Sequence, residues 1–579
     1  MASRRHAIVG GLAAVGLVAT ALAACEAPAR VKPWRHAPDP TAEAAAAPAS
    51  PALTSATASA EVHAARSHTL RIQLDSEPGR LNPLVGPTQW GRRITLGTVF
   101  EPLLRYVPQG AASAAGTYQP RLARAWKVMP DGLEIRIYLE PGVKFHDGHT
   151  LTTSDVQFTL DTVRNPRRNV DQIAPMLADI EAVELITSTE VRLRLKRPNG
   201  WILRALAELP IMPQHIYDGS LLAGGQLVGT GPYRVTSTKS GIIHLTRFDK
   251  YWGGPAAIAD IEFVVQPDAA LALVDAKRGD FDIIPALIPA HYPEQASAPG
   301  IAAAFSLLEL HPVRMRYLAF NPTRPPLDDP RVRHALALLV NRRELEKRVF
   351  DGLARPAVFP IWPGGFASGP EPTVPDFDPA TAARLLDEAG WTDPDRDGIR
   401  DRAGVQLRLA MVGTDKAAPK DVSAPPVKIE RDYLIEAARR VGVVIEMKTG
   451  GESWVDKRVA DGQFDLAELQ WSGMVDADLA PQLGTANLRI ASSVRTDRAL
   501  DALAQVWLPA DRVALTGELA AALAETWPLA GIVADAPKGL ISRRVQNVHL
   551  WDGWIDLDQL RFAPEPPPAT PSARPPLPH

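Results

Sequence analysis

Residues 120–160 constrain the fold of this chain most, because the period of the apolar side chains changes within them. Apolar and polar side chains alternate over 133–139, which is the period-two pattern of a half-buried strand. A turn follows at 147–148, and Thr152 and Asp155 then have the spacing of a capping box that begins a helix. The segment therefore predicts a strand, a turn and a capped helix in that order.

Three further stretches predict the same mixture of helices and strands. Residues 434–441 carry apolar side chains on one helical face, Gly442 ends that helix, and a strand is predicted after it, which is the α/β unit of a parallel sheet. Asp329 is expected to cap a helix whose arginines lie on its solvated face. Residues 69–74 alternate as an edge strand does.

Length and charge limit the class of protein. A chain of 579 residues is too long for one small core, so two or three lobes are expected. Its composition, 46% hydrophobic and 22% charged, is ordinary for a soluble globular protein. The net charge of -3 gives no electrostatic footprint for nucleic acid, and we expect no such partner.

The first 25 residues have the features of an export signal. Arg4 and Arg5 form a charged start, residues 8–21 are weakly apolar, and 22–25 resemble a bacterial lipobox that ends in Cys25. That resemblance implies cleavage before Cys25 and a diacylglycerol on its thiol. The alternatives are an ordinary signal peptide with an incidental cysteine, or an uncleaved anchor helix. No other stretch is long and apolar enough to span a bilayer.

Several stretches of sequence together resemble one family. The four most specific are Leu81–Leu84 (LNPL), Pro120–Leu160, Gly229–Val235 (GTGPYRV) and Tyr317–Leu345. They are similar to the signature of the extracytoplasmic solute-binding proteins of family 5, which serve oligopeptide, dipeptide and nickel ABC transporters. The resemblance extends over roughly residues 68–562. The glycines at 229 and 231 are expected to shape a tight start of a strand rather than a dinucleotide site.

The resemblance implies an α/β fold of the two-lobed, type II periplasmic-binding-protein clamp, with an extra domain in the N-terminal lobe. The expected boundaries are 1–25 for a lipoprotein signal peptide, 26–66 for a disordered Ala/Pro-rich tether, 67–98 with 223–312 and 537–563 for lobe I, 99–222 for the extra domain, 313–536 for lobe II and 564–579 for a disordered Pro-rich tail.

The resemblance also implies the function of a binding protein. It predicts a monomer at the extracytoplasmic side of the cell envelope, held by a lipid anchor, that captures a solute and delivers it to the permease subunits of an ABC importer. An oligopeptide is the first candidate cargo; a nickel chelate, a sugar or an opine, or a role as sensor input, are the alternatives. No cofactor is expected. The motifs GxSxG, HExxH and CxxC are absent from the sequence, so an enzyme is not expected.

The predicted ligand site uses both lobes. Trp471, Asp476 and Asp478 resemble the family's aromatic and acidic motif for a ligand amino group, although the spacing to the following proline differs. Trp90 and Arg92 are expected to face them, with Arg92 on a ligand carboxylate. The alternative is that Trp471 belongs to the core and the two aspartates form a solvated turn.

An acidic turn offers a weak calcium candidate. Asp393, Asp395 and Asp397 have the spacing that begins a calcium loop, but Gly404 stands where a bidentate glutamate belongs. Asp401 is the substitute ligand on this interpretation. The alternative is an acidic surface hairpin without metal.

Overall fold

The computed structural model describes residues 68–84, 88–107, 117–165, 173–217, 227–310, 314–361, 373–414, 427–472, 478–484, 492–508, 511–551 and 554–564. Four predictions concern residues outside these ranges: the signal peptide with Cys25, the tether, nearly all of the C-terminal tail, and Asp476.

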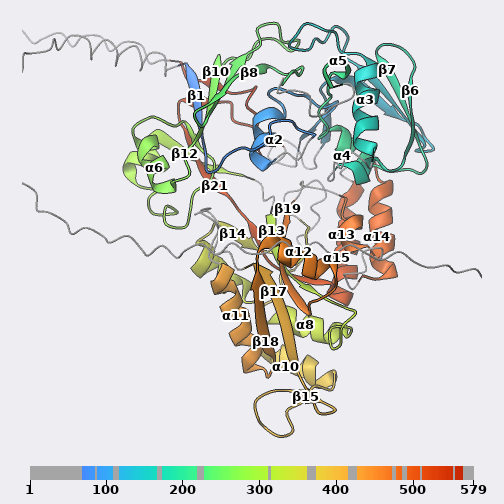
Figure 1. Ribbon diagram of the computed structural model, residues 1–579, viewed down its shortest axis with the longest axis vertical. Helices are drawn as coiled ribbons and strands as arrows, with labels where there is room; N and C mark the ends of the chain where they lie inside the picture. The colour runs from blue at the N-terminus through green and yellow to red at the C-terminus, as the bar shows by residue number, and fades with distance from the viewer. Residues whose placement is uncertain are drawn as a thin grey trace, which may run out of the picture. The chain divides into compact units, whose positions relative to one another are not determined.

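The first large sheet gathers strands from three distant parts of the chain (Figure 1). Its described strands are, in spatial order, β12 (Phe305–Glu309), β21 (Lys538–Ser542), β11 (Ile283–Ile284), β1 (Thr69–Leu74), β10 (Asp260–Val265), β9 (Ile242–Arg247) and β8 (Tyr233–Lys239). β1 pairs in parallel with β10 and β11, and the other pairs are antiparallel.

The prediction of β1 as an edge strand is wrong. β1 lies in the interior of the sheet, between β11 and β10, with Leu70, Ile72 and Leu74 buried. Alternation shows only that one face of a strand is buried. Its position in the sheet depends on partners that lie far along the chain, and the local pattern carries no information about them.

The second large sheet confirms the predicted α/β unit. Its described strands are, in spatial order, β14 (Ala354–Pro356), β20 (Leu529–Asp535), β13 (Arg314–Phe320), β19 (Leu466–Ser472), β17 (Arg408–Thr414) and β18 (Val444–Gly450). The helix α11 (Val427–Arg440) precedes β18, Gly442 follows it with a φ of +82°, and β18 pairs in parallel with β17. Glycine suits that turn because it has no Cβ to clash at positive φ.

The helix α8 (Pro330–Leu338) is capped as predicted, but its arginines divide. Asp329 accepts the backbone N–H of Arg331, and the Arg331 side chain is exposed. Arg333 is buried, and it donates to the carbonyl oxygens of Leu327 at 2.7 Å and Trp527 at 3.1 Å. The expectation of a solvated face is therefore wrong for Arg333, which joins α8 to the end of another helix through backbone carbonyls.

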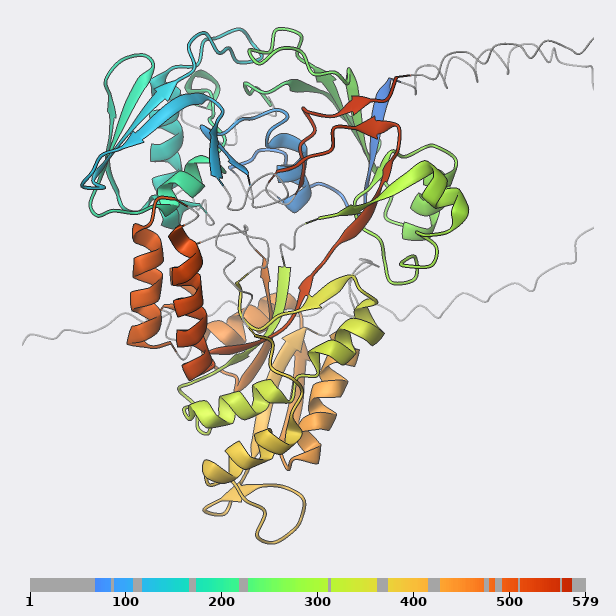
Figure 2. The ribbon, with the colours of Figure 1, turned by 180° about the vertical axis from the view of Figure 1, so that it is seen from behind.

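A smaller antiparallel sheet carries the segment that opened the sequence analysis (Figure 2). Its described strands are β4 (Ala123–Val128), β5 (Glu134–Leu139), β7 (Glu190–Leu195) and β6 (Ile180–Leu185), and α3 (Thr153–Arg164) packs on it. The capping box of Thr152 and Asp155 is present, and Val156, Leu160 and Val163 are buried. The predicted strand, turn and helix are confirmed.

The other described elements are mostly short. The helices are α2 (Gln89–Thr95), α4 (Trp201–Leu206), α5 (Gln214–Tyr217), α6 (Ala269–Lys277), α7 (Pro299–Ala304), α9 (Arg342–Leu345), α10 (Pro379–Glu388), α12 (Glu452–Ala460), α13 (Ala480–Leu483), α14 (Val494–Gln505) and α15 (Arg512–Thr526), with a 3-10 turn at Ala174–Leu177 and a π turn at Glu346–Phe350. The two-stranded ribbons pair β2 (Leu104–Val107) with β3 (Thr117–Pro120), β15 (Asp401–Arg402) with β16 (Val405–Gln406), β22 (Val545–Gln546) with β25 (Arg561–Phe562), and β23 (Leu550–Trp551) with β24 (Trp554–Ile555).

The chain passes between the two large sheets at two adjacent places. β12 leads to β13 and β20 leads to β21; β12 pairs with β21 in one sheet, and β13 pairs with β20 in the other. A hydrogen bond from the Leu310 N–H to the Pro537 oxygen, at 3.0 Å, joins the two connections. The exact domain boundaries stay a prediction.

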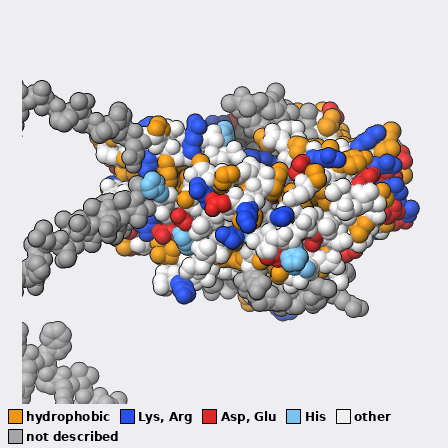
Figure 3. Space-filling view, turned by 90° about the horizontal axis from the view of Figure 1, so that it is seen from above, with side chains coloured by type: hydrophobic (Ala, Val, Ile, Leu, Met, Phe, Trp, Pro, Cys, Tyr) orange, Lys and Arg blue, Asp and Glu red, His pale blue; other side chains and the backbone are white. Residues whose placement is uncertain are grey.

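The distribution of charged side chains on the surface (Figure 3) is consistent with the nearly balanced numbers of acidic and basic residues in the sequence. Acidic and basic side chains are interspersed over the face shown in Figure 3. Among the described residues, the structure contains no helix with both the length and the apolar character needed to cross a bilayer.

His146 joins the loop after β5 to the start of β8. Its Nε2 donates to the Gly231 oxygen at 2.9 Å, and its Nδ1 accepts the Gly229 N–H at 3.3 Å. The ring also meets Phe248 edge to face at 5.1 Å. One ring nitrogen donates and the other accepts, so the imidazole is neutral. Burial lowers the pKa of His146 to about 4.

The predicted tight start of β8 has a steric basis. A Cβ on Gly229 would lie 1.9 Å from the Val99 oxygen, and one on Gly231 would lie 2.2 Å from the Thr98 oxygen. Glycine is required at both positions because the backbones approach closely, rather than because of a positive φ.

His146 predicts a pH dependence of stability. The free energy of unfolding should fall by roughly 2–3 kcal/mol between pH 7 and pH 4 through this group, because the unfolded imidazole protonates near pH 6.5 while the folded one stays neutral. Chemical denaturation at the two pH values measures this difference, and it should shrink in His146→Gln. The control is His244→Gln, which should keep the wild-type difference. An equal pH dependence in His146→Gln and wild type would contradict the assignment.

Candidate functional site

The helix α2 holds an arginine against two tryptophan rings that contact each other. The guanidinium of Arg93 lies 5.0 Å from the centroid of the Trp90 ring and 4.5 Å from that of Trp554. The two tryptophans meet edge to face, with ring centroids 5.5 Å apart and planes at 84°. Cation–π contacts of this kind hold a guanidinium in a fixed orientation while its N–H groups stay available.

Local structure explains this arrangement. Thr88 accepts the Gly91 N–H at 3.0 Å and caps α2. Trp90 and Arg93 are three residues apart in a helix and therefore share a face. The Trp90 indole N–H donates to Asp75 at 2.6 Å, which fixes the ring. The aromatic side of the site is thus held in place by hydrogen bonds of its own.

Arg93 is a cation that forms no ion pair with the described residues, although Asp75 lies near enough to act on its pKa. Among the described residues, no carboxylate lies within ion-pair distance of this half-buried side chain. Burial and the positive charge of Arg314 lower the pKa of Arg93 to about 10, and Asp75 offsets part of that shift. Arg314 itself is paired with Asp535 at 2.6 Å. The site therefore presents a protonated guanidinium that can receive an anionic group.

Arg92, the predicted carboxylate ligand, has a partner within the protein. It forms an ion pair with Glu208, whose side chain is fully buried. Glu208 also pairs with the equally buried Arg204 at 2.5 Å. The carboxylate needs these cations because an unpaired buried charge is strongly destabilising. A role for Arg92 in ligand binding stays a prediction. In the structure its charge compensates that of the buried Glu208.

Two of the three predicted residues of the second lobe, Trp471 and Asp478, lie in the described part of the chain, and each has partners of its own. Trp471 is half-buried on β19, opposite Met315 of β13, and packs on the core. Asp478 accepts the Ala480 N–H at 2.9 Å, at the start of α13. Burial raises the pKa of Asp478, and Arg197 is among the charges that oppose the shift. Asp476 lies outside the described residues.

Trp471 and Arg93 are related through the start of β13. Arg314, whose charge acts on Arg93, lies opposite Ser472 in the strand register, and Met315 lies opposite Trp471. The strand ends that carry Trp471 and Arg314 thus lie toward α2. The structure brings Trp90 together with Arg93 and Trp554, and it places Asp478 with Arg197.

Sequence reasoning missed Arg93 and Trp554. The i, i+3 spacing of Trp90 and Arg93 was available as a signal, because α2 begins at a capping threonine. Trp554 follows an Asp-Gly dipeptide that separates it from Trp551, as in a tight hairpin. Nothing local indicates that this hairpin packs against α2, some 460 residues earlier by the numbering.

The acidic turn uses its carboxylates to shape its own backbone. Asp393 accepts the Gly398 N–H at 3.1 Å, Asp395 accepts that of Asp397 at 3.3 Å, and Asp397 accepts that of Ile399 at 2.7 Å. One oxygen from each of these three aspartates lies within 4.8 Å of the others. Asp401 is not part of that group in the described residues. Calcium binding here stays a prediction.

Comparison with known proteins identifies the family of the chain. Residues 117–486 match the family model of the bacterial extracellular solute-binding proteins, family 5. The nickel-binding periplasmic protein of Escherichia coli (strain K12) is 28% identical over 435 residues, which cover 71% of this chain and 76% of that relative. The glutathione-binding protein of Salmonella paratyphi A is 30% identical over 280 residues, or 47% of this chain and 53% of that relative. The second match thus spans about half of the relative's length.

Solved structures agree with the fold. HbpA2 from Haemophilus parasuis has a TM-score of 0.72 at 21% identity, over 86% of this chain and 100% of that chain. The predicted fold class, an α/β two-lobed clamp of the type II periplasmic binding proteins, is confirmed.

Proposed function

The chain belongs to the bacterial extracellular solute-binding proteins, family 5, and we propose that it captures a solute with a free carboxylate, an oligopeptide in the first place, and delivers it to an ABC importer. The observation that carries this proposal is Arg93, a half-buried cation between Trp90 and Trp554 without a carboxylate partner in the described part of the chain. We propose no catalytic role.

The chemistry of Arg93 favours a carboxylate. A guanidinium presents paired N–H donors that match the two oxygens of a carboxylate, so one contact supplies both charge and orientation. The tryptophan walls add apolar area at a small entropic cost, and they tolerate varied neighbouring side chains. A terminal carboxylate next to variable residues is what peptides have in common.

Other cargoes with carboxylates are alternatives. Organic chelates of nickel and opines also carry this group, and the relatives named above are a nickel-binding and a glutathione-binding protein. A sugar without a carboxylate is disfavoured by the charge of Arg93. Mass spectrometry of the solute that co-purifies with the protein identifies the class directly.

The location and partners follow the family. We place the protein at the extracytoplasmic side of the envelope as a monomer that docks on permease subunits, with a lipid on Cys25. The match to the family 5 model begins at residue 117, well after Cys25, so the sequence between them is long enough to include the proposed tether of residues 26–66.

Arg93→Met should weaken peptide binding by roughly 2 kcal/mol or more, which is about thirty-fold or more in affinity, because a bound carboxylate loses its cation. Calorimetry with a co-purified peptide and its C-terminal amide tests this. Amidation should weaken binding to wild type by a similar factor and should have little further effect on Arg93→Met.

Arg92→Met is the matched control. It should lower the free energy of unfolding, because the buried Glu208 loses one of its two cations. If Arg93 holds the carboxylate, the folded Arg92→Met protein should still distinguish the peptide from its amide; loss of that distinction in Arg92→Met alone would assign the carboxylate to Arg92. The proposal fails if Arg93→Met keeps that distinction, or if only solutes without a carboxylate co-purify.

Cys25→Ala should release the protein from the membrane fraction. The reason is that a diacylglycerol on the thiol is the predicted anchor, and its buried acyl chains dominate membrane affinity. Fractionation of lysed cells followed by immunoblotting measures the distribution. Retention of Cys25→Ala in the membrane fraction would assign the anchor to another feature.

Asp476→Asn and Asp478→Asn test the predicted ammonium site. If either carboxylate binds the peptide amino group, its removal should weaken binding by roughly 2–5 kcal/mol. N-acetylation of the peptide should remove the same contact in wild type. Asp478→Asn alone should also relieve the cost of burying that carboxylate. Wild-type affinity in both variants would contradict the predicted ammonium site. It would favour the alternative in which Trp471 belongs to the core and the two aspartates form a turn.

A further inference from the structure

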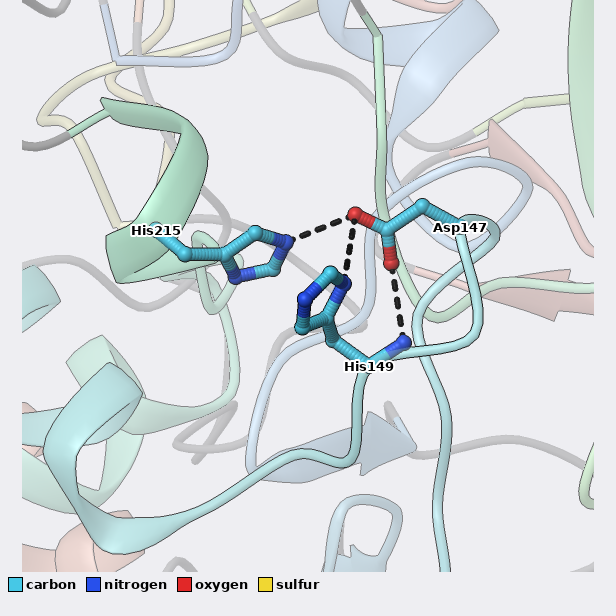
Figure 4. A group of neighbouring side chains, drawn as sticks. All are labelled: Asp147, His149 and His215. Atoms are coloured by element: carbon cyan, nitrogen blue, oxygen red, sulfur yellow. Dashed lines mark hydrogen bonds and ion pairs between the residues drawn. The ribbon is translucent and has the colours of Figure 1, made fainter.

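Two histidines and one aspartate converge on the surface beside α5. Asp147 Oδ2 lies 2.6 Å from Nε2 of His215 and 3.2 Å from Nδ1 of His149. The two imidazole rings lie against each other at a tilt, with centroids 3.9 Å apart and planes at 32°. Figure 4 shows both rings directing a nitrogen at one carboxylate oxygen. One ligand atom from each residue lies within 4.8 Å of the other two.

The backbone around these side chains is well supported. Asp147 and His149 lie on either side of Gly148, at a turn where Asp147 Oδ1 accepts the His149 N–H at 3.1 Å. His215 stands on α5, and its ring meets the fully buried Phe145 at 5.9 Å. The Gln214 N–H donates to Asp155 at 2.9 Å, which ties the start of α5 to the capping box of α3. The three side chains are therefore held together before any ligand binds.

We propose that Asp147, His149 and His215 bind one divalent transition-metal ion of the Zn²⁺ type. Two imidazoles and one carboxylate are a donor set that such ions prefer over Ca²⁺ or Mg²⁺. Bonds of ~2.0–2.1 Å at tetrahedral angles place ligand atoms about 3.3 Å apart. The present separations of 2.6 and 3.2 Å from the carboxylate oxygen require only a small outward movement to reach that value.

The site is open on one side. The exposed fractions of the side chains are 26% for Asp147, 31% for His215 and 64% for His149, so water or an added ligand can complete the coordination. Without metal, the two ring nitrogens donate their N–H groups to the same oxygen. With metal, each imidazole carries its proton on its other nitrogen and presents a lone pair instead.

The neighbouring His146 does not belong to the site. Both of its ring nitrogens are used by Gly229 and Gly231, and it is buried against Phe248. The His149 side chain, by contrast, makes its ion-pair and ring contacts in the described residues with Asp147 and with the His215 ring, while the backbone oxygen of His149 accepts the Phe145 N–H at 2.8 Å. Its exposed imidazole contributes little to the fold and is the right residue to change.

The experiment uses the full chain without a polyhistidine tag, after removal of metals with EDTA. Co²⁺ is added, and its visible d–d absorption is followed until saturation; Zn²⁺ is then added as competitor. We expect one equivalent of Co²⁺ to give the bands and Zn²⁺ to abolish them. His149→Gln should weaken Zn²⁺ binding by at least about tenfold, and the double variant with His215→Gln should define the background from the other histidines.

His244→Gln is the matched control, because His244 also faces a carboxylate, Asp260 at 3.3 Å, but has no second imidazole in the group. It should bind Co²⁺ and Zn²⁺ like wild type. Unchanged metal affinity in both His149→Gln and the double variant overturns the proposal, as does displacement of Co²⁺ by Ca²⁺ at the concentration at which Zn²⁺ displaces it. Cargo binding should be unchanged in His149→Gln, so this result is independent of the proposed function.

Discussion

The buried carboxylate of Glu101 joins three distant parts of the chain. It forms an ion pair with Arg121 at 2.7 Å and accepts hydrogen bonds from Tyr251 at 2.7 Å and Trp252 at 3.0 Å. Burial, together with the charge of Glu101, raises the pKa of Tyr251, so that hydroxyl stays a donor. A fully buried carboxylate is tolerated only when its charge and its lone pairs are satisfied. Arg121, just before β4, and the loop before β10 therefore lie against Glu101, which follows α2 in the chain. These contacts hold the segment that follows α2 in place.

Two adjacent arginines of α2 have different partners. Arg92 turns toward Glu208, where a fully buried carboxylate needs its charge, whereas Arg93 lies on the face of Trp90 and Trp554. Neighbours in a helix point about 100° apart, so one cannot replace the other. The same short helix thus supplies one cation to the fold, Arg92, and one cation to the candidate site, Arg93. The position of the buried Glu208 determines that Arg92 is the one paired within the fold.

Local signals in the sequence predicted the fold well, and distant contacts limited the prediction of the site. Helix caps such as Thr152 and Asp329 depend on residues three or four positions apart, and the structure confirms both helices. The burial of Arg333 depends on carbonyls at the end of α15, and the position of β1 depends on β10 and β11. The sequence predicts Arg92 as the carboxylate ligand, but it does not show that Glu208 lies beside Arg92 and Trp554 beside Arg93. The family resemblance supplied the overall arrangement, but the partner of each charge came from the tertiary structure.

The charges near the two sheets bear on how binding at Arg93 could act on the relative position of the sheets, if the proposed function holds. β12 is followed in the chain by β13 and β20 by β21, so the chain passes between the two sheets twice where these strands pair. Arg93 belongs to the segment after β1, and Arg314 begins β13, so like charges face each other from the two sides. A ligand shifts such an equilibrium only through its different affinity for the two arrangements. On the proposed function, a carboxylate bound at Arg93 adds a negative charge beside two guanidinium groups, of which Arg314 is already paired with Asp535, and it lowers the remaining repulsion between them. An uncharged solute of the same size leaves that repulsion in place, so the charge of the cargo, and not its bulk alone, favours closure.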